Sequence, residues 1–161
     1  MFRRGAEVRG LSVGERTMAL AMFGDVIDYD GVRLRRDKWW PFQPRLGVMA
    51  PDGNIWFHPA GPHWHEDFAV APVAAQGLFI HEMTHVYHAA RGGRWWLPLM
   101  RHPFCRYDYV IRPGKPFHHY GIEQQAEIVR HAFLLRHGVH LPGRPSLAAY
   151  EALLPFRGMA G

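Results

Sequence analysis

The sequence predicts an α+β fold in which a small antiparallel sheet packs on two long helices. Residues 31–58 carry short strand-like segments separated by turn residues, whereas residues 72–90 and 121–137 have helical patterns. The chain has 161 residues, and 48% of them are hydrophobic, which is enough to build one buried core. We therefore predict a single domain over residues 1–161.

The first helix is predicted over residues 12–23. Ser12 and Glu15 have the spacing of a capping box, in which each side chain bonds the backbone N–H of the other residue. Gly24 then provides a stop signal. Residues 31–36 follow, and their alternation of apolar and basic side chains predicts a half-buried strand.

A hairpin is predicted at residues 46–58. The segments 46–50 and 55–58 have strand character, and Pro51-Asp52-Gly53 between them is typical of a tight turn. The two strands are therefore expected to be antiparallel, and the hairpin is expected to offer an edge strand. An extended peptide can bind such an edge as an additional strand.

Two long helices are predicted after the hairpin. They cover residues 72–90 and 121–137, and each is followed by glycine, which favours a helix end. A short strand at residues 107–111 separates them. A last short helix is expected between Ser146, which can cap it, and Pro155.

Residues 81–85 read H-E-M-T-H, an H-E-x-x-H pattern on the first long helix. Residues four apart lie about one helical turn apart, so His81 and His85 project from one face and can hold one tetrahedral zinc ion. Glu82 follows the first histidine, which places its carboxylate beside the metal rather than on it. The motif predicts zinc-assisted hydrolysis with Glu82 as the general base.

A third ligand is expected on the second long helix, because a catalytic zinc usually has three protein ligands and one open position. Glu123 and Glu127 lie one turn apart on that helix. One carboxylate can bind the metal while the other accepts a hydrogen bond from a ligand histidine. The spacing leaves both assignments open.

The combined pattern resembles the gluzincin metallopeptidases, in which H-E-x-x-H is followed by a helix with E-x-x-A-[DE]. Residues 123–127, E-Q-Q-A-E, match this second motif, with Glu127 where aspartate is more usual. The resemblance implies a zincin-like fold, hydrolysis of peptide bonds, and zinc bound by His81, His85 and Glu123. It also implies that Glu127 supports a ligand histidine.

Three longer segments, residues 78–86, 94–109 and 120–133, resemble small bacterial proteins described as Vgr-related or Rhs-associated. These names refer to parts of the type VI secretion system. The resemblance implies a secretion or toxin context and a secretion-system partner. It specifies no substrate beyond a peptide or protein.

Further polar residues near the motif each allow two interpretations. His88 lies three residues beyond His85; we favour a role in supporting the site, and the alternative is a fourth ligand that would make the zinc structural. Tyr120 and His131 are candidates for stabilising an oxyanion, because that role needs a hydrogen-bond donor. The other candidates are Tyr107, Tyr109 and His119. No spacing rule selects among the five, and each is alternatively a core residue.

The sequence indicates where in the cell the protein is expected. No apolar run is long enough for a membrane span, and no signal peptide is visible. We expect a cytoplasmic protein, or one exported by a system that reads no signal peptide. The one cysteine, Cys105, excludes an internal disulfide and is expected to be a small buried residue.

Two functions of other classes are alternatives. A non-catalytic, zinc-stabilised binding module of a secretion assembly would have no need of Glu82. A nucleic-acid-associated protease is suggested by the net charge of +5 and by tryptophan pairs at residues 39–40 and 95–96, which can stack on bases. Such tryptophans more often pack on a core, and we expect that here.

Overall fold

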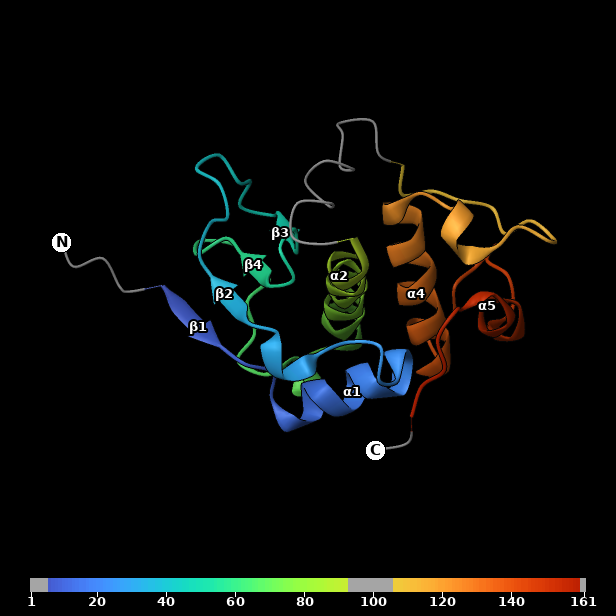
Figure 1. Cartoon of the computed structure of the whole chain (residues 1–161), viewed down its shortest axis with the longest axis horizontal. Helices are drawn as coiled ribbons and strands as arrows, with labels where there is room; N and C mark the ends of the chain where they lie inside the picture. The colour runs from blue at the N-terminus through green and yellow to red at the C-terminus, as the bar shows by residue number, and fades with distance from the viewer. Residues whose placement is uncertain (1–5, 93–105, 160–161) are drawn as a thin grey trace.

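The structure of the chain is a computed structural model, which describes residues 6–92 and 106–159 (Figure 1). Within these two ranges the chain forms four α-helices and a four-stranded sheet, which confirms the α+β class. None of the described helices is long and apolar enough to cross a membrane. Cys105 and the tryptophan pair at residues 95–96 lie outside the described residues.

Helix α1 spans Val13–Phe23, as the sequence predicts. The Ser12 hydroxyl accepts a hydrogen bond from the Glu15 N–H at 3.0 Å, and the Glu15 carboxylate accepts one from the Ser12 N–H at 2.8 Å. These two bonds are the expected capping box. Gly24 follows with a φ of 65°, a conformation that favours glycine, and ends the helix.

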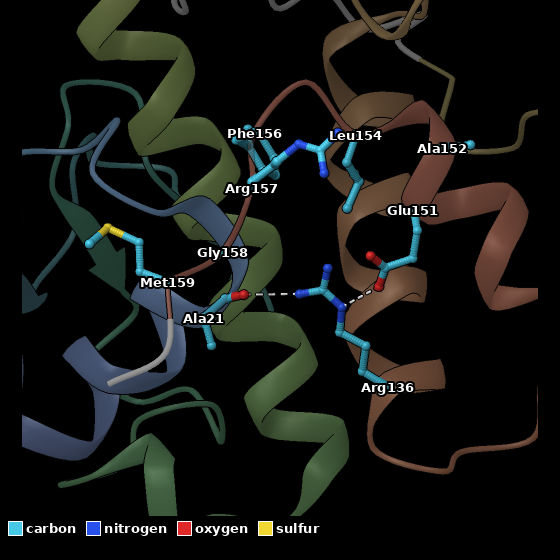
Figure 2. A pocket seen from close by; sticks show the side chains of 9 residues that line it. All are labelled: Ala21, Arg136, Glu151, Ala152, Leu154, Phe156, Arg157, Gly158 and Met159. Carbon is cyan, nitrogen blue, oxygen red and sulfur yellow. Dashed lines mark hydrogen bonds and ion pairs between the residues drawn. The ribbon is translucent and has the colours of Figure 1, made fainter.

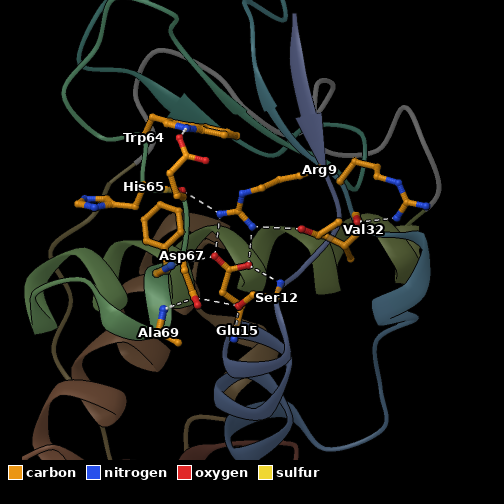
Figure 3. Close-up of polar contacts among 12 residues, drawn as sticks. Arg9, Ser12, Glu15, Val32, Trp64, His65, Asp67 and Ala69 are labelled. Atoms are coloured by element: carbon orange, nitrogen blue, oxygen red, sulfur yellow. Dashed lines mark hydrogen bonds and ion pairs between the residues drawn. The ribbon is translucent and has the colours of Figure 1, made fainter.

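Glu15 also joins α1 to two other segments (Figure 3). Its side chain is fully buried, and both of its oxygens accept from the Arg9 guanidinium at 2.8 Å. One oxygen also accepts from the Phe68 N–H at 2.9 Å. Arg9 belongs to strand β1 (Glu7–Arg9), and Phe68 begins the 3₁₀ turn Phe68–Val70, which precedes the long helix α2 (Val73–Gly92). The network therefore fixes the start of α2 relative to α1 and the sheet.

The sheet has the strand order β1–β2–β4–β3. Strand β2 spans Leu34–Arg36, β3 spans Val48–Met49, and β4 spans Ile55–Phe57. β1 pairs antiparallel with β2 and β3 antiparallel with β4, but β2 and β4 are parallel. The sheet is therefore mixed, and the expectation of a purely antiparallel sheet is wrong.

The parallel pair has a physical cause. Leu34 of β2 and Ile55 of β4 lie opposite each other, and both are fully buried in the core. The chain between them is long enough for the crossover that a parallel pair requires. The second strand of the hairpin can therefore lie beside β2. Strand β1 is absent from the sequence-based prediction because Glu7 and Val8 are both exposed and show no alternation.

The predicted hairpin is confirmed. Val48 pairs with Phe57 and Met49 pairs with Trp56, and the turn between the strands contains Gly53, whose φ is 85°. Strand β3 lies at one edge of the sheet formed by the described residues. The hairpin therefore offers the edge strand that the sequence predicts.

The loop between β2 and β3 presents aromatic side chains to solvent. Trp40 is 41% exposed and contacts Phe42 edge-on, so the expectation that residues 39–40 pack on the core is wrong for Trp40. Gln43 is buried and holds the loop from inside. It accepts from the Trp39 N–H at 2.8 Å and donates to two backbone carbonyls. These bonds fix the base of the loop and leave Trp40 outside.

Helix α2 spans Val73–Gly92 and α4 spans Ile122–Arg136, close to the predicted bounds. Figure 1 shows α2 between the sheet and α4, with the predicted last helix, α5 (Leu147–Leu153), beyond α4. Gly77 of α2 faces Leu134 of α4, where an added β-carbon would lie 3.1 Å from the leucine side chain. The small residue therefore lets the two helices approach closely.

An aromatic stack connects the sheet to α2. Phe57 of β4 stacks on Phe68 with ring centroids 5.5 Å apart, and Phe68 stacks on Phe79 of α2 with centroids 5.4 Å apart. All three rings are buried, and such offset stacks favour a defined geometry. The stack therefore positions α2 over the sheet.

The predicted strand at residues 107–111 is not formed. The Tyr109 hydroxyl instead contacts His131 of α4 at 2.5 Å and Tyr150 of α5 at 2.6 Å. Figure 1 shows both helices on the side of α2 away from the sheet. The segment is therefore held by side-chain bonds to helices, far from any described strand that could pair with it.

Candidate metal centre

The middle of α2 is buried around its whole circumference. Every residue from Phe79 to Ala89 is buried, although this stretch contains three histidines and a glutamate. Buried polar groups are costly unless they are hydrogen-bonded or bind a cation. The partners of these side chains come mainly from α4, which packs along α2.

Three of the predicted site residues meet at one point. The Nε2 atoms of His81 and His85 lie 3.2 Å and 3.1 Å from the same oxygen, Oε2 of Glu123. One nitrogen or oxygen from each of the three residues lies within 4.8 Å of the others. Two imidazoles and one carboxylate are a donor set that suits a divalent metal ion, so the three residues could hold one.

Glu127 contacts the other side of the first histidine. Its Oε1 lies 2.8 Å from Nδ1 of His81, and it also accepts from the Arg130 guanidinium at 3.3 Å. His81 therefore lies between two carboxylates, Glu123 at Nε2 and Glu127 at Nδ1. Of the two glutamates, only Glu123 belongs to the group that meets, which is the arrangement that the gluzincin resemblance implies.

The electrostatics of the group favour positive charge. Burial disfavours the charged form of His81, but hydrogen bonds to Glu123 and Glu127 outweigh it and raise the pKa of His81 to about 9. Burial alone would raise the pKa of Glu123, yet bonds to His81 and His85 hold that pKa well below its usual range. The pKa of Glu127 is also lowered, by His81 and Arg130 against the effect of burial. The same carboxylates would attract a divalent cation.

His88 lies behind His85 rather than beside Glu123. Its Nδ1 is 3.3 Å from Nδ1 of His85, and its Nε2 is 2.8 Å from Oε1 of Gln125. Burial and the neighbouring His85 lower the pKa of His88 to about 3, so this imidazole is neutral. His88 is not part of the group of three, and its role in supporting the site stays a prediction.

Sequence reasoning missed Gln125. It is only 5% exposed and lies between the two predicted glutamates on α4. A glutamine in a helix is usually a surface residue, so its type gives no signal of a buried role. Only its helical position relative to Glu123 could have drawn attention to it.

The remaining predicted residues lie at different distances from the group. Glu82 is 4% exposed, and its negative charge contributes to the raised pKa of His81, the residue before it on α2. The Tyr107 ring stacks on His81 with centroids 6.3 Å apart. The Tyr120 hydroxyl accepts from the Arg112 N–H at 3.0 Å. His119 is exposed at the end of a 3₁₀ turn, Phe117–His119.

His131 connects the group to a chain of hydroxyls. Its Nε2 is 3.5 Å from Oε2 of Glu127, and its Nδ1 is 2.5 Å from the Tyr109 hydroxyl, which also contacts the Tyr150 hydroxyl. Burial is the largest effect on His131 and lowers its pKa. His131 therefore touches the carboxylate that supports His81. Its predicted role at an oxyanion stays a prediction.

A separate hollow lies at the C-terminal end of the described chain (Figure 2). It has a volume of about 820 Å³ and lies between α1, α4, α5 and the segment that follows α5. Arg136 donates to the Ala21 carbonyl at 3.0 Å and to Glu151 at 2.5 Å. None of its lining residues belongs to the group of His81, His85 and Glu123, so the hollow is distinct from the candidate metal centre.

Comparisons with known proteins give two matches. No established family profile matches the chain. The type VI secretion system spike protein VgrG2b of Pseudomonas aeruginosa is 41% identical over an alignment of 134 residues, and the match covers 78% of this chain and 13% of VgrG2b. The solved effector domain of VgrG2b has a TM-score of 0.72 and 36% identity, covering 89% of this chain and 80% of that domain. The chain thus matches a small part of the spike protein but most of its effector domain.

Proposed function

Because the chain belongs to the family of the VgrG2b effector domain, we propose that it is an effector domain of a type VI secretion system with zinc-dependent peptidase activity. The identity of 36% extends over 80% of the solved effector domain, so the relationship covers most of that domain. A spike-protein relative supports a secretion-system partner and export without a signal peptide. We also propose that the fold is zincin-like.

One observation carries the proposed chemistry. His81 and His85 direct their Nε2 atoms to the same carboxylate oxygen of Glu123, inside the core and between two packed helices. We assign these three residues as the zinc ligands. A bound zinc ion would supply a Lewis acid that polarises a scissile carbonyl and acidifies water.

The other residues have complementary roles in this proposal. Glu82 is the general base: its carboxylate takes a proton from the attacking water and returns it to the leaving amine. Its burial, at 4% exposed, limits competition from bulk water. Glu127 holds His81 through the 2.8 Å contact at Nδ1, so that Nε2 faces the metal position. Tyr120 and His131 remain candidates for binding the oxyanion.

The proposed substrate is an extended peptide or protein segment. Strand β3 lies at an edge of the described sheet, and a peptide can pair with such an edge through its backbone. Backbone pairing gives affinity without a fixed sequence. The exposed Trp40 and Phe42 precede β3 in the chain and are available to contact substrate side chains.

The Glu82→Gln variant tests the peptidase proposal. The parent, Glu82→Gln and the surface control Glu7→Gln are loaded with zinc and incubated with unfolded proteins and peptide libraries, and products are read by mass spectrometry. We expect Glu82→Gln to keep its zinc and stability while losing roughly a hundred- to ten-thousand-fold in turnover. Glu7→Gln should match the parent. Equal cleavage by the parent and Glu82→Gln would contradict the proposal. A parent that cleaves no substrate would also contradict it, and this result would favour the alternative of a non-catalytic binding module.

A further inference from the structure

A line of hydrogen bonds leads from His85 away from the candidate metal centre, through His88 and Gln125 to the backbone of Tyr120. Nδ1 of His85 lies 3.3 Å from Nδ1 of His88, and Nε2 of His88 lies 2.8 Å from Oε1 of Gln125. The Gln125 amide nitrogen donates to the backbone carbonyl of Tyr120 at 2.7 Å. His85, His88 and Gln125 are each no more than 5% exposed, so these bonds are shielded from water.

The direction of every bond in this line follows from its last member. A backbone carbonyl can only accept, so the Gln125 NH₂ group must face Tyr120 and its carbonyl oxygen must face His88. That oxygen also only accepts, so the proton of His88 is on Nε2. Because the ring proton of His88 is placed on Nε2, its Nδ1 has the lone pair and accepts from the Nδ1–H of His85.

The consequence appears at the metal position. With its proton on Nδ1, a neutral His85 has a lone pair on Nε2, which can take a cation in place of a proton shared with Oε2 of Glu123, 3.1 Å away. A carboxylate oxygen is an acceptor as well. Two acceptors at this distance attract a shared cation, so the line of bonds prepares His85 as a metal ligand.

We propose that Gln125, acting through His88, is a positioning residue that fixes the Nδ1–H tautomer of His85 and presents its Nε2 to the metal. This inference rests on the proposed metal site but not on the proposed peptidase activity. The two histidine ligands are then supported differently. Nδ1 of His81 contacts the carboxylate of Glu127. Nδ1 of His85 instead contacts His88, and the line of hydrogen bonds continues to the backbone carbonyl of Tyr120, just before α4.

The residue type at position 125 is specified by this role. The line needs an acceptor for His88 and a donor for Tyr120 in one side chain, and the glutamine amide provides both. A glutamate keeps the acceptor but loses the donor. A methionine of similar length has neither group, and leaves the His88 Nε2–H without its bond to residue 125.

The test measures zinc affinity and imidazole tautomers in the full chain. We expect Gln125→Met to weaken zinc binding by about 10- to 100-fold in competition with a chromophoric chelator, as changes around metal ligands typically do. Gln124→Met, the same substitution one position earlier on α4, removes bonds to Gly121 and Asp108 but no contact with His88, and should weaken zinc binding less than Gln125→Met. Gln125→Glu should lie between the parent and Gln125→Met, because it still accepts from His88 but no longer donates to Tyr120.

Nitrogen-15 NMR of the zinc-loaded parent reads the tautomers directly and needs no variant to fold. We expect His88 to be protonated at Nε2 and His85 at Nδ1. Protonation of His88 at Nδ1 only, zinc bound to His88, or equal affinities for Gln125→Met and Gln124→Met would each overturn the inference. These measurements are independent of activity, so a protein that binds zinc without cleaving peptides can still confirm the positioning role.

Discussion

Nδ1 of His81 and Oε1 of Glu127 lie 2.8 Å apart, a contact that joins the middle of α2 to α4. Because this nitrogen is occupied, only Nε2 of His81 can face Glu123, 3.2 Å away. The orientation of the ring is therefore fixed from behind. Position 127 has glutamate where aspartate is more usual in the gluzincin family that the sequence resembles, and this longer side chain contacts His81.

We predict that Glu127→Gln weakens zinc binding by about 10- to 100-fold without abolishing it, because an amide is a poorer acceptor and lacks the negative charge that favours the cation. Chelator competition measures the change. Glu151→Gln is the matched control, because Glu151 pairs with Arg136 at the surface and lies outside the metal group. If Glu127→Gln loses zinc as completely as Glu123→Gln, Glu127 is itself a ligand and its assignment changes.

Local periodicity accounts for much of what the sequence predicted. The capping box joins Ser12 to Glu15, three positions later in the sequence, and His81 and His85 are spaced by about one helical turn. Both features are present in the structure, because each depends on the geometry of a single helix. The approach of Glu123 to these histidines depends on the packing of two helices, and a family resemblance was needed to choose it over Glu127.

Features that depend on packing between distant segments could not be predicted. The parallel pairing of β2 with β4 is set by the burial of Leu34 against Ile55, which no local pattern encodes. The same holds for Gln125, since only the position of α2 shows that it is buried against His88. Glu15 is another case: its cap is local, but its contact with Arg9 joins two elements.

We predict that Glu15→Gln lowers the free energy of unfolding by about 3 kcal/mol, because it leaves the Arg9 guanidinium facing a neutral group in a mostly buried position. The Glu15 side chain is fully buried and that of Arg9 is 20% exposed, so solvent screens the pair only in part. Urea unfolding measures the change.

Glu7→Gln provides the control for this pair. Glu7 is 3.5 Å from Arg36, and both side chains are well exposed, so we expect a loss below about 1 kcal/mol. Equal losses for the two variants would show that burial does not strengthen the Arg9–Glu15 contact.

We predict that the purified protein carries about one zinc ion per chain, because two helix imidazoles and a carboxylate form a typical three-ligand site. Elemental analysis after desalting measures the content. The double variant His81→Ala, His85→Ala should contain almost none. His63→Ala, His65→Ala removes two histidines outside the metal group and should retain the parent's zinc. Undiminished zinc in the first double variant would place the metal elsewhere.

The proposed zinc site would also stabilise the fold, because its ligands come from both α2 and α4. A ligand that binds only the native state at a thousand times its Kd adds about 4 kcal/mol, and for a domain of this size that corresponds to roughly 10 °C in Tm. We therefore expect chelation to lower the Tm of the parent by about this amount. The metal-free protein should still fold, because the aromatic stack of Phe57, Phe68 and Phe79 holds α2 on the sheet independently. The Tm of His81→Ala, His85→Ala should be the same with and without chelator. An unchanged Tm in the parent, with metal loss confirmed by elemental analysis, would mean that the zinc does not connect the two helices.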